Sequence, residues 1–127
     1  MSRQIINTVN APQPKAPLSQ AVRSGNLVFV SGMTPFTTDS KLSKGDFDSQ
    51  MRQTMENLGA VLEASATGFD RVLKCTVILA RIEDWQRMNE IYSESWPNGS
   101  FPARTAFSAP LPHPDFLVEV ECVAETG

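Results

Sequence analysis

The sequence has few of the residues that build metal or redox centres. It contains one histidine, which cannot form a histidine-rich metal site, and two cysteines. Cys75 and Cys122 have neither CxxC spacing nor a neighbouring histidine, so they suggest neither metal binding nor redox chemistry. Both lie in strand-like segments, and we expect both to be small buried hydrophobic residues.

Basic clusters and long apolar runs are also missing. The 11 basic and 14 acidic side chains give a net charge of −3, and the basic residues are scattered. This pattern argues against a nucleic-acid partner, which would need a basic surface. No apolar run approaches the roughly 20 residues of a membrane span, and residues 1–10 lack the apolar core of a signal peptide. We therefore expect a cytoplasmic protein with no membrane partner.

Length and composition favour one globular domain over residues 1–127. Apolar residues make up 41% of the chain and charged residues 20%, as in ordinary soluble proteins. Residue patterns predict strands at 19–23, 27–31, 72–79 and 116–124, and helices at 47–62 and 85–96. The predicted fold is α+β, a mixed four-stranded sheet with two helices on one face.

The helices are predicted from apolar residues that repeat with helical spacing. In the first helix the stripe consists of Phe47, Met51, Met55, Leu58 and Leu62. Its start is at Gly45 or Asp46, and Gly68 lies beyond its end. The second helix has a stripe of Trp85, Met88, Tyr92 and Trp96, which we interpret as core.

The last strand alternates between an apolar and a mixed face. Phe116, Val118, Val120, Cys122 and Ala124 point to one side, and we expect this side to pack under the helices. The opposite side carries Glu119 and Glu121 between Leu117 and Val123. Since that face is only half polar, we expect it to be buried against another subunit of a homo-oligomer.

Arg104 is the strongest candidate for ligand binding. A guanidinium presents a planar fork that fits a carboxylate and stays charged at physiological pH. The residue lies in a short strand-like stretch after Pro102. The alternative is a structural salt bridge from Arg104 to Glu119 or Glu121, and the sequence leaves both interpretations open.

Seven segments, in this order and spacing, resemble the Rid/YjgF family of reactive-intermediate deaminases. They cover nearly the whole chain and are 17–21 (PLSQA), 27–32 (LVFVSG), 53–58 (QTMENL), 61–64 (VLEA), 89–92 (NEIY), 102–105 (PART) and 118–121 (VEVE). The resemblance implies a chorismate-mutase-like fold and a homotrimer with sites in clefts between subunits. It also implies hydrolysis of 2-imino or enamine acids to 2-oxo acids and ammonia, without a metal or organic cofactor.

The resemblance also implies roles for individual residues. Arg104 would bind the substrate carboxylate, Glu119 would position or activate the attacking water, and Ser31 and Asn89 would line the site. Simpler interpretations stay open, because Ser31 could be a turn hydroxyl and Asn89 could brace the second helix. Glu121 could pair with Lys74 or form a hydrogen bond at a subunit interface, and we expect His113 to be an exposed loop residue.

Three positions depart from the pattern of the best-known deaminase subfamily. Leu18 stands where that subfamily has tyrosine, Met33 where glutamine is common and Ala106 where cysteine is common. The cleft, which Leu18 and Ala106 would line, is therefore more apolar, and a bulkier or more hydrophobic imino acid fits this composition. The alternative is a non-catalytic protein that binds small carboxylates as a sensor or stabilising factor. Ribonuclease activity, attributed to some family members, is opposed by the acidic charge.

Overall fold

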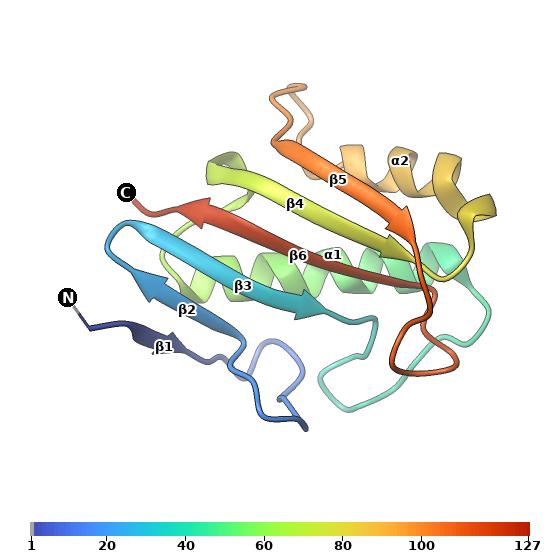
Figure 1. The fold of residues 1–127 in the computed structure, drawn as a ribbon, viewed down its shortest axis with the longest axis horizontal. Coiled ribbons are helices and arrows are strands. Elements are labelled where there is room, and N and C mark those ends of the chain that lie inside the picture. Colours follow the sequence, from blue (N-terminus) through green and yellow to red (C-terminus); the bar gives the residue numbers. More distant parts are fainter. Residues whose placement is uncertain (1) are drawn as a thin grey trace.

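The computed structural model describes residues 2–127, which form one mixed sheet and two α-helices (Figure 1). In chain order the elements are β1 (Gln4–Ile6), β2 (Ala21–Ser24), β3 (Leu27–Met33), α1 (Phe47–Ala64), β4 (Val72–Leu79), α2 (Trp85–Ser93), β5 (Ala103–Ser108) and β6 (Val118–Glu125). Short 3₁₀ helices at Phe69–Arg71 and Ile82–Asp84 precede β4 and α2.

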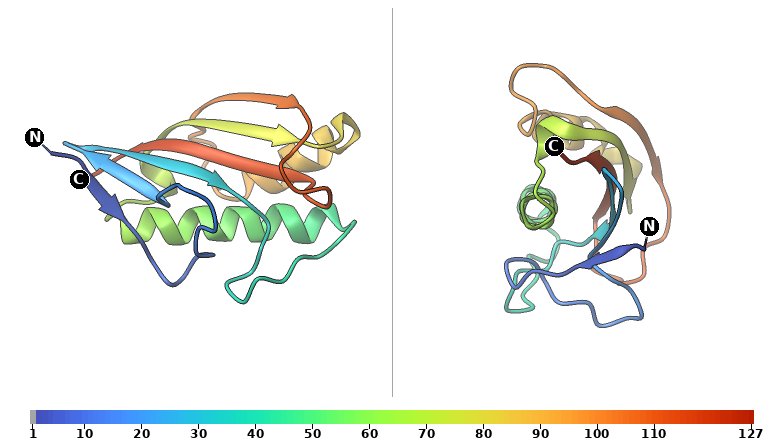
Figure 2. Two further views of the ribbon diagram at one scale, coloured as in Figure 1. Left: turned by 60° about the horizontal axis from the view of Figure 1, so that its bottom comes forward. Right: turned by 90° about the vertical axis from the view of Figure 1, so that its left-hand side faces the viewer.

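The six strands are ordered β1-β2-β3-β6-β4-β5. Neighbours pair antiparallel except β4 and β5, which are parallel. The last strand of the chain therefore lies at the centre of the sheet, between β3 and β4, and β5 forms one edge. Both helices pack on the same face and leave the other face open (Figure 2).

The N-cap residue of α1 is Asp46. Asp46 has an extended backbone, and its carboxylate accepts a hydrogen bond of 3.2 Å from the backbone N–H of Ser49. This capping bond satisfies a free helical N–H and decides between the two predicted starts. All five residues of the predicted stripe are buried against the sheet.

The predicted α+β fold with a mixed sheet and two helices is confirmed, but the predicted number of strands is wrong. β1 has only three residues, too few to show an alternating pattern. β5 corresponds to the strand-like stretch around Arg104, which was not counted among the predicted strands, and it pairs only with β4 at the edge of the sheet.

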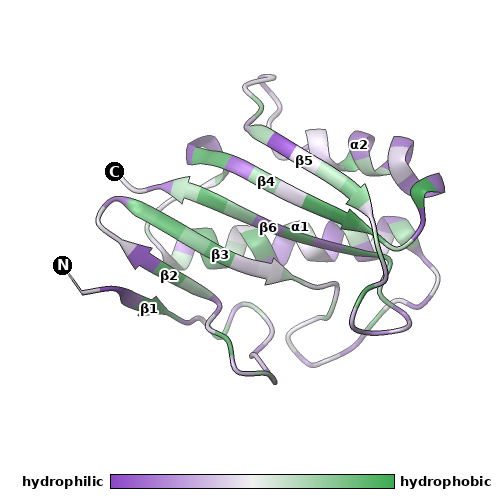
Figure 3. Ribbon diagram, in the orientation of Figure 1, coloured by the Kyte–Doolittle hydropathy of each residue, from purple (hydrophilic) through white to green (hydrophobic). Residues whose placement is uncertain are grey.

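The predicted alternation of the last strand agrees with the observed burial. The residues expected to pack under the helices are all buried, whereas Glu119 is half-buried and Glu121 is exposed. Figure 3 shows hydrophilic segments in the middle of β6 between hydrophobic ones. The two cysteines are buried and directly opposite each other in the register of β4 and β6, as small hydrophobic residues would be.

His113 differs from the expectation of an exposed loop residue. It is half-buried, stacked on Phe116 with ring centroids 4.8 Å apart and edge-on to Phe36 at 5.7 Å. Its Nδ1 accepts a hydrogen bond of 3.0 Å from the backbone N–H of Asp115. The ring therefore braces the loop before β6.

Among residues 2–127, none of the helices has the length and apolar character needed to cross a bilayer.

Candidate functional site

Arg104 lies at the end of a row of paired residues that crosses the whole sheet. The register joins, in order, Ile6, Ala21, Val30, Cys122, Cys75 and Arg104. Paired residues point to the same face of a sheet, and the first five are buried under the helices. Arg104 therefore extends from the edge strand on the helix-covered face, beside α2.

Side chains of α2 surround the guanidinium of Arg104. Its Nη1 donates a hydrogen bond of 2.7 Å to Oδ1 of Asn89 and lies 3.5 Å from the sulfur of Met88. The guanidinium carbon is 4.9 Å from the ring centre of Tyr92 and 5.5 Å from that of Trp85. These cation–π contacts and the hydrogen bond hold the cation in one orientation. Asn89 thus contacts Arg104 and does more than brace its own helix.

The charge of Arg104 is not neutralised by an acidic side chain. None of the ion pairs within residues 2–127 includes it, so the alternative of a structural salt bridge to Glu119 or Glu121 is wrong for the isolated chain. Arg104 lines an open pocket of about 350 Å³ together with Asn89, Tyr92, Ser93, Phe101 and Pro102. A half-buried guanidinium with free donors, facing a pocket, is suited to bind a small carboxylate.

Glu119 lies on the opposite, open face of the sheet. It pairs with Ile78 of β4, which pairs with Phe107 of β5. Burial, and next the negative charge of Glu121, raise the pKa of the Glu119 carboxyl above its ordinary value. Since a general base works best with a pKa near the working pH, this shift suits Glu119 to exchange protons with water.

Gly32 provides the space that the Glu119 side chain occupies. A Cβ atom added to Gly32 would lie 2.2 Å from Oε2 of Glu119, far inside van der Waals contact. The backbone of β3 is bulged between Val30 and Met33, so it carries one extra residue opposite β6. Glycine at position 32 therefore lets the carboxylate lie directly on the strand.

Ser31, next to Gly32 in the bulge, uses its hydroxyl within the fold. The hydroxyl donates a hydrogen bond of 2.6 Å to the backbone oxygen of Ser19, and its backbone N–H donates to the oxygen of Gln20 at 3.0 Å. Ser31 thus ties β3 to the segment before β2.

Glu121 has no ion pair to Lys74, and in the sheet it faces Thr76.

Arg104 and Glu119 do not meet within one chain. They lie on opposite faces, two strands apart and three residues apart along the sheet, so their Cα atoms are separated by roughly 14 Å in the sheet plane. A site that uses both groups needs a second copy of the chain.

Of the remaining predicted residues, Ala106 lies near Arg104, whereas Leu18 and Met33 lie near Gly32. Ala106 follows Arg104 on the same face of β5 and packs against the core. Leu18 is 51% exposed and, with the buried Met33, lines a cavity next to Gly32.

Sequence reasoning missed three contributors, namely Trp85, Tyr92 and Gly32. Tyr92 is buried in the core as predicted, whereas Trp85 is 37% exposed, and both also contact Arg104 from the face of α2 that carries Asn89. Within residues 2–127, no three side chains of histidine, cysteine, aspartate or glutamate are grouped so that they could hold a metal ion.

Comparisons with known proteins cover almost the entire chain. The family model described as Endoribonuclease L-PSP matches residues 8–126. A RutC family protein of Drosophila melanogaster is 42% identical over 126 residues, which is 98% of this chain and 91% of the fly protein. The 2-iminobutanoate/2-iminopropanoate deaminase of Mus musculus is 37% identical over 127 residues, 98% of this chain and 93% of the mouse protein.

A solved structure has the same fold at high similarity. The crystal structure of a conserved Rid family protein of unknown function from Yersinia pestis superposes with a TM-score of 0.94 and 32% identity. The match covers 98% of this chain and 100% of the Yersinia chain.

Proposed function

The chain belongs to the Endoribonuclease L-PSP family, also called Rid/YjgF, and on this premise we propose that it is a hydrolytic deaminase of 2-imino and enamine acids. The products are the 2-oxo acid and ammonia. The observation that carries the proposal is the guanidinium of Arg104, which is oriented by Asn89 and has no acidic partner within residues 2–127.

Arg104 binds the substrate carboxylate and fixes the position of the neighbouring iminium carbon. Two parallel hydrogen bonds from the guanidinium to the carboxylate define both the distance and the orientation of the substrate. The bound iminium is already electrophilic, so hydrolysis needs no covalent nucleophile. Holding it beside an activated water turns an encounter of two molecules into a positioned reaction.

Glu119 exchanges protons with the attacking water and the leaving nitrogen. The carboxylate takes a proton as the water oxygen bonds to C2 and the carbon–nitrogen π bond breaks. Glu119 then returns this proton to the amine of the carbinolamine. The carbon–nitrogen bond breaks, the hydroxyl proton leaves with the nitrogen as ammonium, and the 2-oxo acid remains. The raised pKa of Glu119 makes the carboxyl a better proton acceptor and so supports the first step.

A complete site combines Arg104 of one copy with Glu119 of the next. The opposite faces of the two groups in one chain support this arrangement, and a homotrimer, typical of the family, would supply three such clefts. The open sheet face carries exposed Phe29 and Phe107, which a partner subunit would cover.

The experiment follows the loss of 2-imino acids made in situ from amino acids by an amino-acid oxidase. We expect the protein to accelerate their hydrolysis, Arg104→Ala to abolish both turnover and carboxylate binding, and Glu119→Gln to retain binding but slow hydrolysis. Arg52→Ala and Glu63→Gln, at exposed positions, are the matched controls.

Carboxylate binding without any acceleration would reject the deaminase and favour a non-catalytic binding protein. The apolar residues Leu18, Met33 and Ala106 make this the second candidate. Turnover that survives Arg104→Ala would contradict the assigned site. A ribonuclease is the weakest candidate, because the chain is acidic and its basic residues are scattered.

A further inference from the structure

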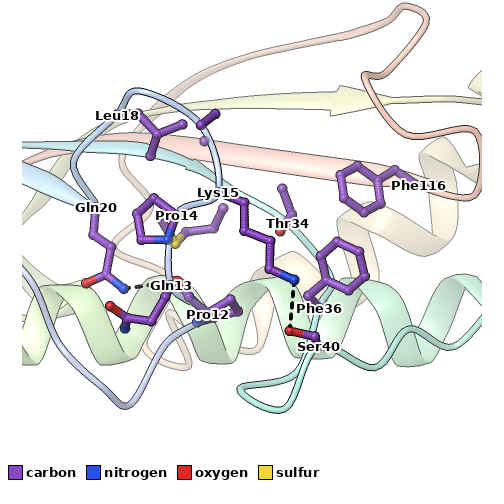
Figure 4. Close-up of a pocket in the computed structure, with 13 residues that line it drawn as sticks. Pro12, Gln13, Pro14, Lys15, Leu18, Gln20, Thr34, Phe36, Ser40 and Phe116 are labelled. Carbon is purple, nitrogen blue, oxygen red and sulfur yellow. Dashed lines mark hydrogen bonds between the residues drawn. The ribbon is translucent and has the colours of Figure 1, made fainter.

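A cavity of about 280 Å³ lies between the segment before β2 and the segment that follows β3 (Figure 4). Its walls are largely apolar and include Pro12, Pro14, Leu18, Met33, Phe36 and Phe116. The volume is just below the usual range for small-molecule sites, so it suits a side chain or a small metabolite.

Two buried amide side chains hold the walls of this cavity in place. Gln20 is 1% exposed, and its amide nitrogen donates to the backbone oxygens of Thr8 and Pro12 at 3.1 and 3.0 Å. Asn57 of α1 is also 1% exposed and donates to the oxygens of Thr34 and Phe36 at 2.9 and 2.8 Å. Because both segments are fixed by buried hydrogen bonds, the cavity exists before any ligand binds.

Gly32 connects the cavity with the carboxylate of Glu119. Gly32 is part of its lining, and the Glu119 side chain lies against the same glycine, where even a Cβ atom would be 2.2 Å from Oε2. A molecule with its reacting carbon beside Glu119 can therefore direct a substituent past Gly32 and Leu18 into the cavity.

The chemistry of the walls selects an apolar substituent. The one cationic group that lines the cavity is Lys15, which is exposed and donates to the hydroxyl of Ser40 at 3.3 Å. The lining also includes Gln13, Gln20, Thr34 and Ser40, but most of its surface is apolar, so burial of an apolar substituent is favoured over burial of a polar one. The ammonium group also disfavours a cationic substituent.

We propose that this cavity receives the side chain of the substrate, and that the protein prefers 2-imino acids with large apolar side chains over 2-iminopropanoate. This proposal rests on the proposed deaminase function. An extra methylene group in an apolar pocket improves discrimination by about tenfold or more. The imine made from leucine should therefore exceed the imine made from alanine in kcat/KM by at least about tenfold.

The test compares kcat/KM for imines made from alanine, leucine and phenylalanine. Thr34 lines the cavity and its backbone is already fixed, so Thr34→Trp fills the space. We expect this variant to reduce the preference for the leucine-derived imine at least tenfold. Thr38→Trp, the same change at an exposed position outside the cavity, should keep the preference. If Thr34→Trp fails to fold, Ala16→Phe narrows the cavity from the other segment.

The outcomes distinguish a failure of the cavity proposal from a failure of the proposed deaminase function. No acceleration of any imine rejects the deaminase; binding of 4-methyl-2-oxopentanoate and pyruvate, measured by calorimetry, then decides on the cavity. Binding at least tenfold tighter for the larger acid supports the proposal, and equal binding overturns it. A wild-type preference for 2-iminopropanoate, or an equal effect of Thr34→Trp on all imines, also overturns it. Binding of the larger acid that survives Arg104→Ala would assign the cavity to a separate ligand, against the proposal.

Discussion

Gly32 and Glu119 show how a single hydrogen atom in place of a side chain can determine the position of a reactive group. The carboxylate of Glu119 occupies the volume that a Cβ at position 32 would need. Because the colliding atom is at the end of a flexible side chain, the fold can accommodate a larger residue by moving the carboxylate.

We therefore expect Gly32→Ala to lower kcat at least tenfold while the melting temperature changes little. Hydrolysis of the imine panel and thermal unfolding followed by circular dichroism measure the two effects. Gly68→Ala is the matched control, since its Cβ would meet another carboxylate oxygen, that of Asp70 at 3.1 Å, away from the site. Full activity of Gly32→Ala would show that the position of the Glu119 carboxylate does not limit the reaction.

The pH dependence of the reaction should report on the pair of Glu119 and Glu121. The charge of Glu121 contributes to the raised pKa of Glu119, after the effect of burial. If Glu119 must be ionised to accept a proton, kcat/KM falls as pH drops through the pKa of Glu119. Removing the neighbouring charge lowers that pKa.

Glu121→Gln should therefore move the acid limb of the kcat/KM profile to lower pH. Glu125→Gln removes the same charge six residues from Glu119, about 20 Å along the strand, and should leave the limb in place. A shift to higher pH in Glu121→Gln, or equal shifts in both variants, would contradict the assignment of the limb to Glu119.

At the scale of elements, Gln50 connects α1 to the chain that enters β6. Its side chain is fully buried and donates to the backbone oxygens of Ser43 and Asp115 at 3.0 and 2.9 Å. Its oxygen accepts a hydrogen bond of 2.8 Å from the backbone N–H of Leu117. One side chain thus fixes Leu117, the residue directly before β6 and two residues before Glu119.

Gln50→Leu should lower the free energy of unfolding by about 3 kcal/mol, because it leaves these backbone groups without partners at similar side-chain volume. Urea unfolding measures the change. Gln86→Leu makes the same substitution at an exposed position of α2 and should alter the stability by less than about 0.5 kcal/mol. A loss for Gln50→Leu as small as for the control would mean that water replaces the lost hydrogen bonds.

At the scale of the whole molecule, the opposite faces of Arg104 and Glu119 give a direct test of a site shared between subunits. Arg104→Ala retains Glu119, and Glu119→Gln retains Arg104. If the two variants are unfolded together in equal amounts and refolded, about one quarter of the clefts combine both native groups.

The mixed sample should therefore recover about one quarter of the wild-type activity, whereas Arg104→Ala refolded alone should stay inactive and Glu119→Gln refolded alone should stay slow. Mass measurement under native conditions should show three copies of the 14.0 kDa chain. If the mixture is no more active than the two variants summed separately, Arg104 and Glu119 do not act together across a subunit interface. A monomeric mass would contradict a site shared between subunits.

Local patterns in the sequence were sufficient for most of the secondary structure. The stripe from Phe47 to Leu62 predicted α1, and the β-branched run at 72–79 predicted β4, because each pattern depends on neighbours within a few residues. Along β6, the alternation of apolar and polar residues correctly separated the buried face from the face with Glu119. β1 escaped prediction and β5 was expected only as a strand-like stretch, since short edge strands are defined by their partners more than by their own residues.

The candidate site residues Arg104, Glu119, Ser31, Asn89, Leu18 and Ala106 came from residue type and from the resemblance of segments to a family. Sequence order alone could not say which of them meet. The register across β6, β4 and β5 decided that Arg104 and Glu119 lie on opposite faces, and the packing of α2 put Trp85 and Tyr92 against the guanidinium.

Hydrophobic periodicity is a local property of the chain, and it was enough to predict both helices and four of the six strands. The three-dimensional fold was needed to show that Gly32 lies beneath Glu119 and also lines a largely apolar cavity. These features depend on contacts between residues distant in sequence, whose geometry is set by strand register, a bulge and two buried amides.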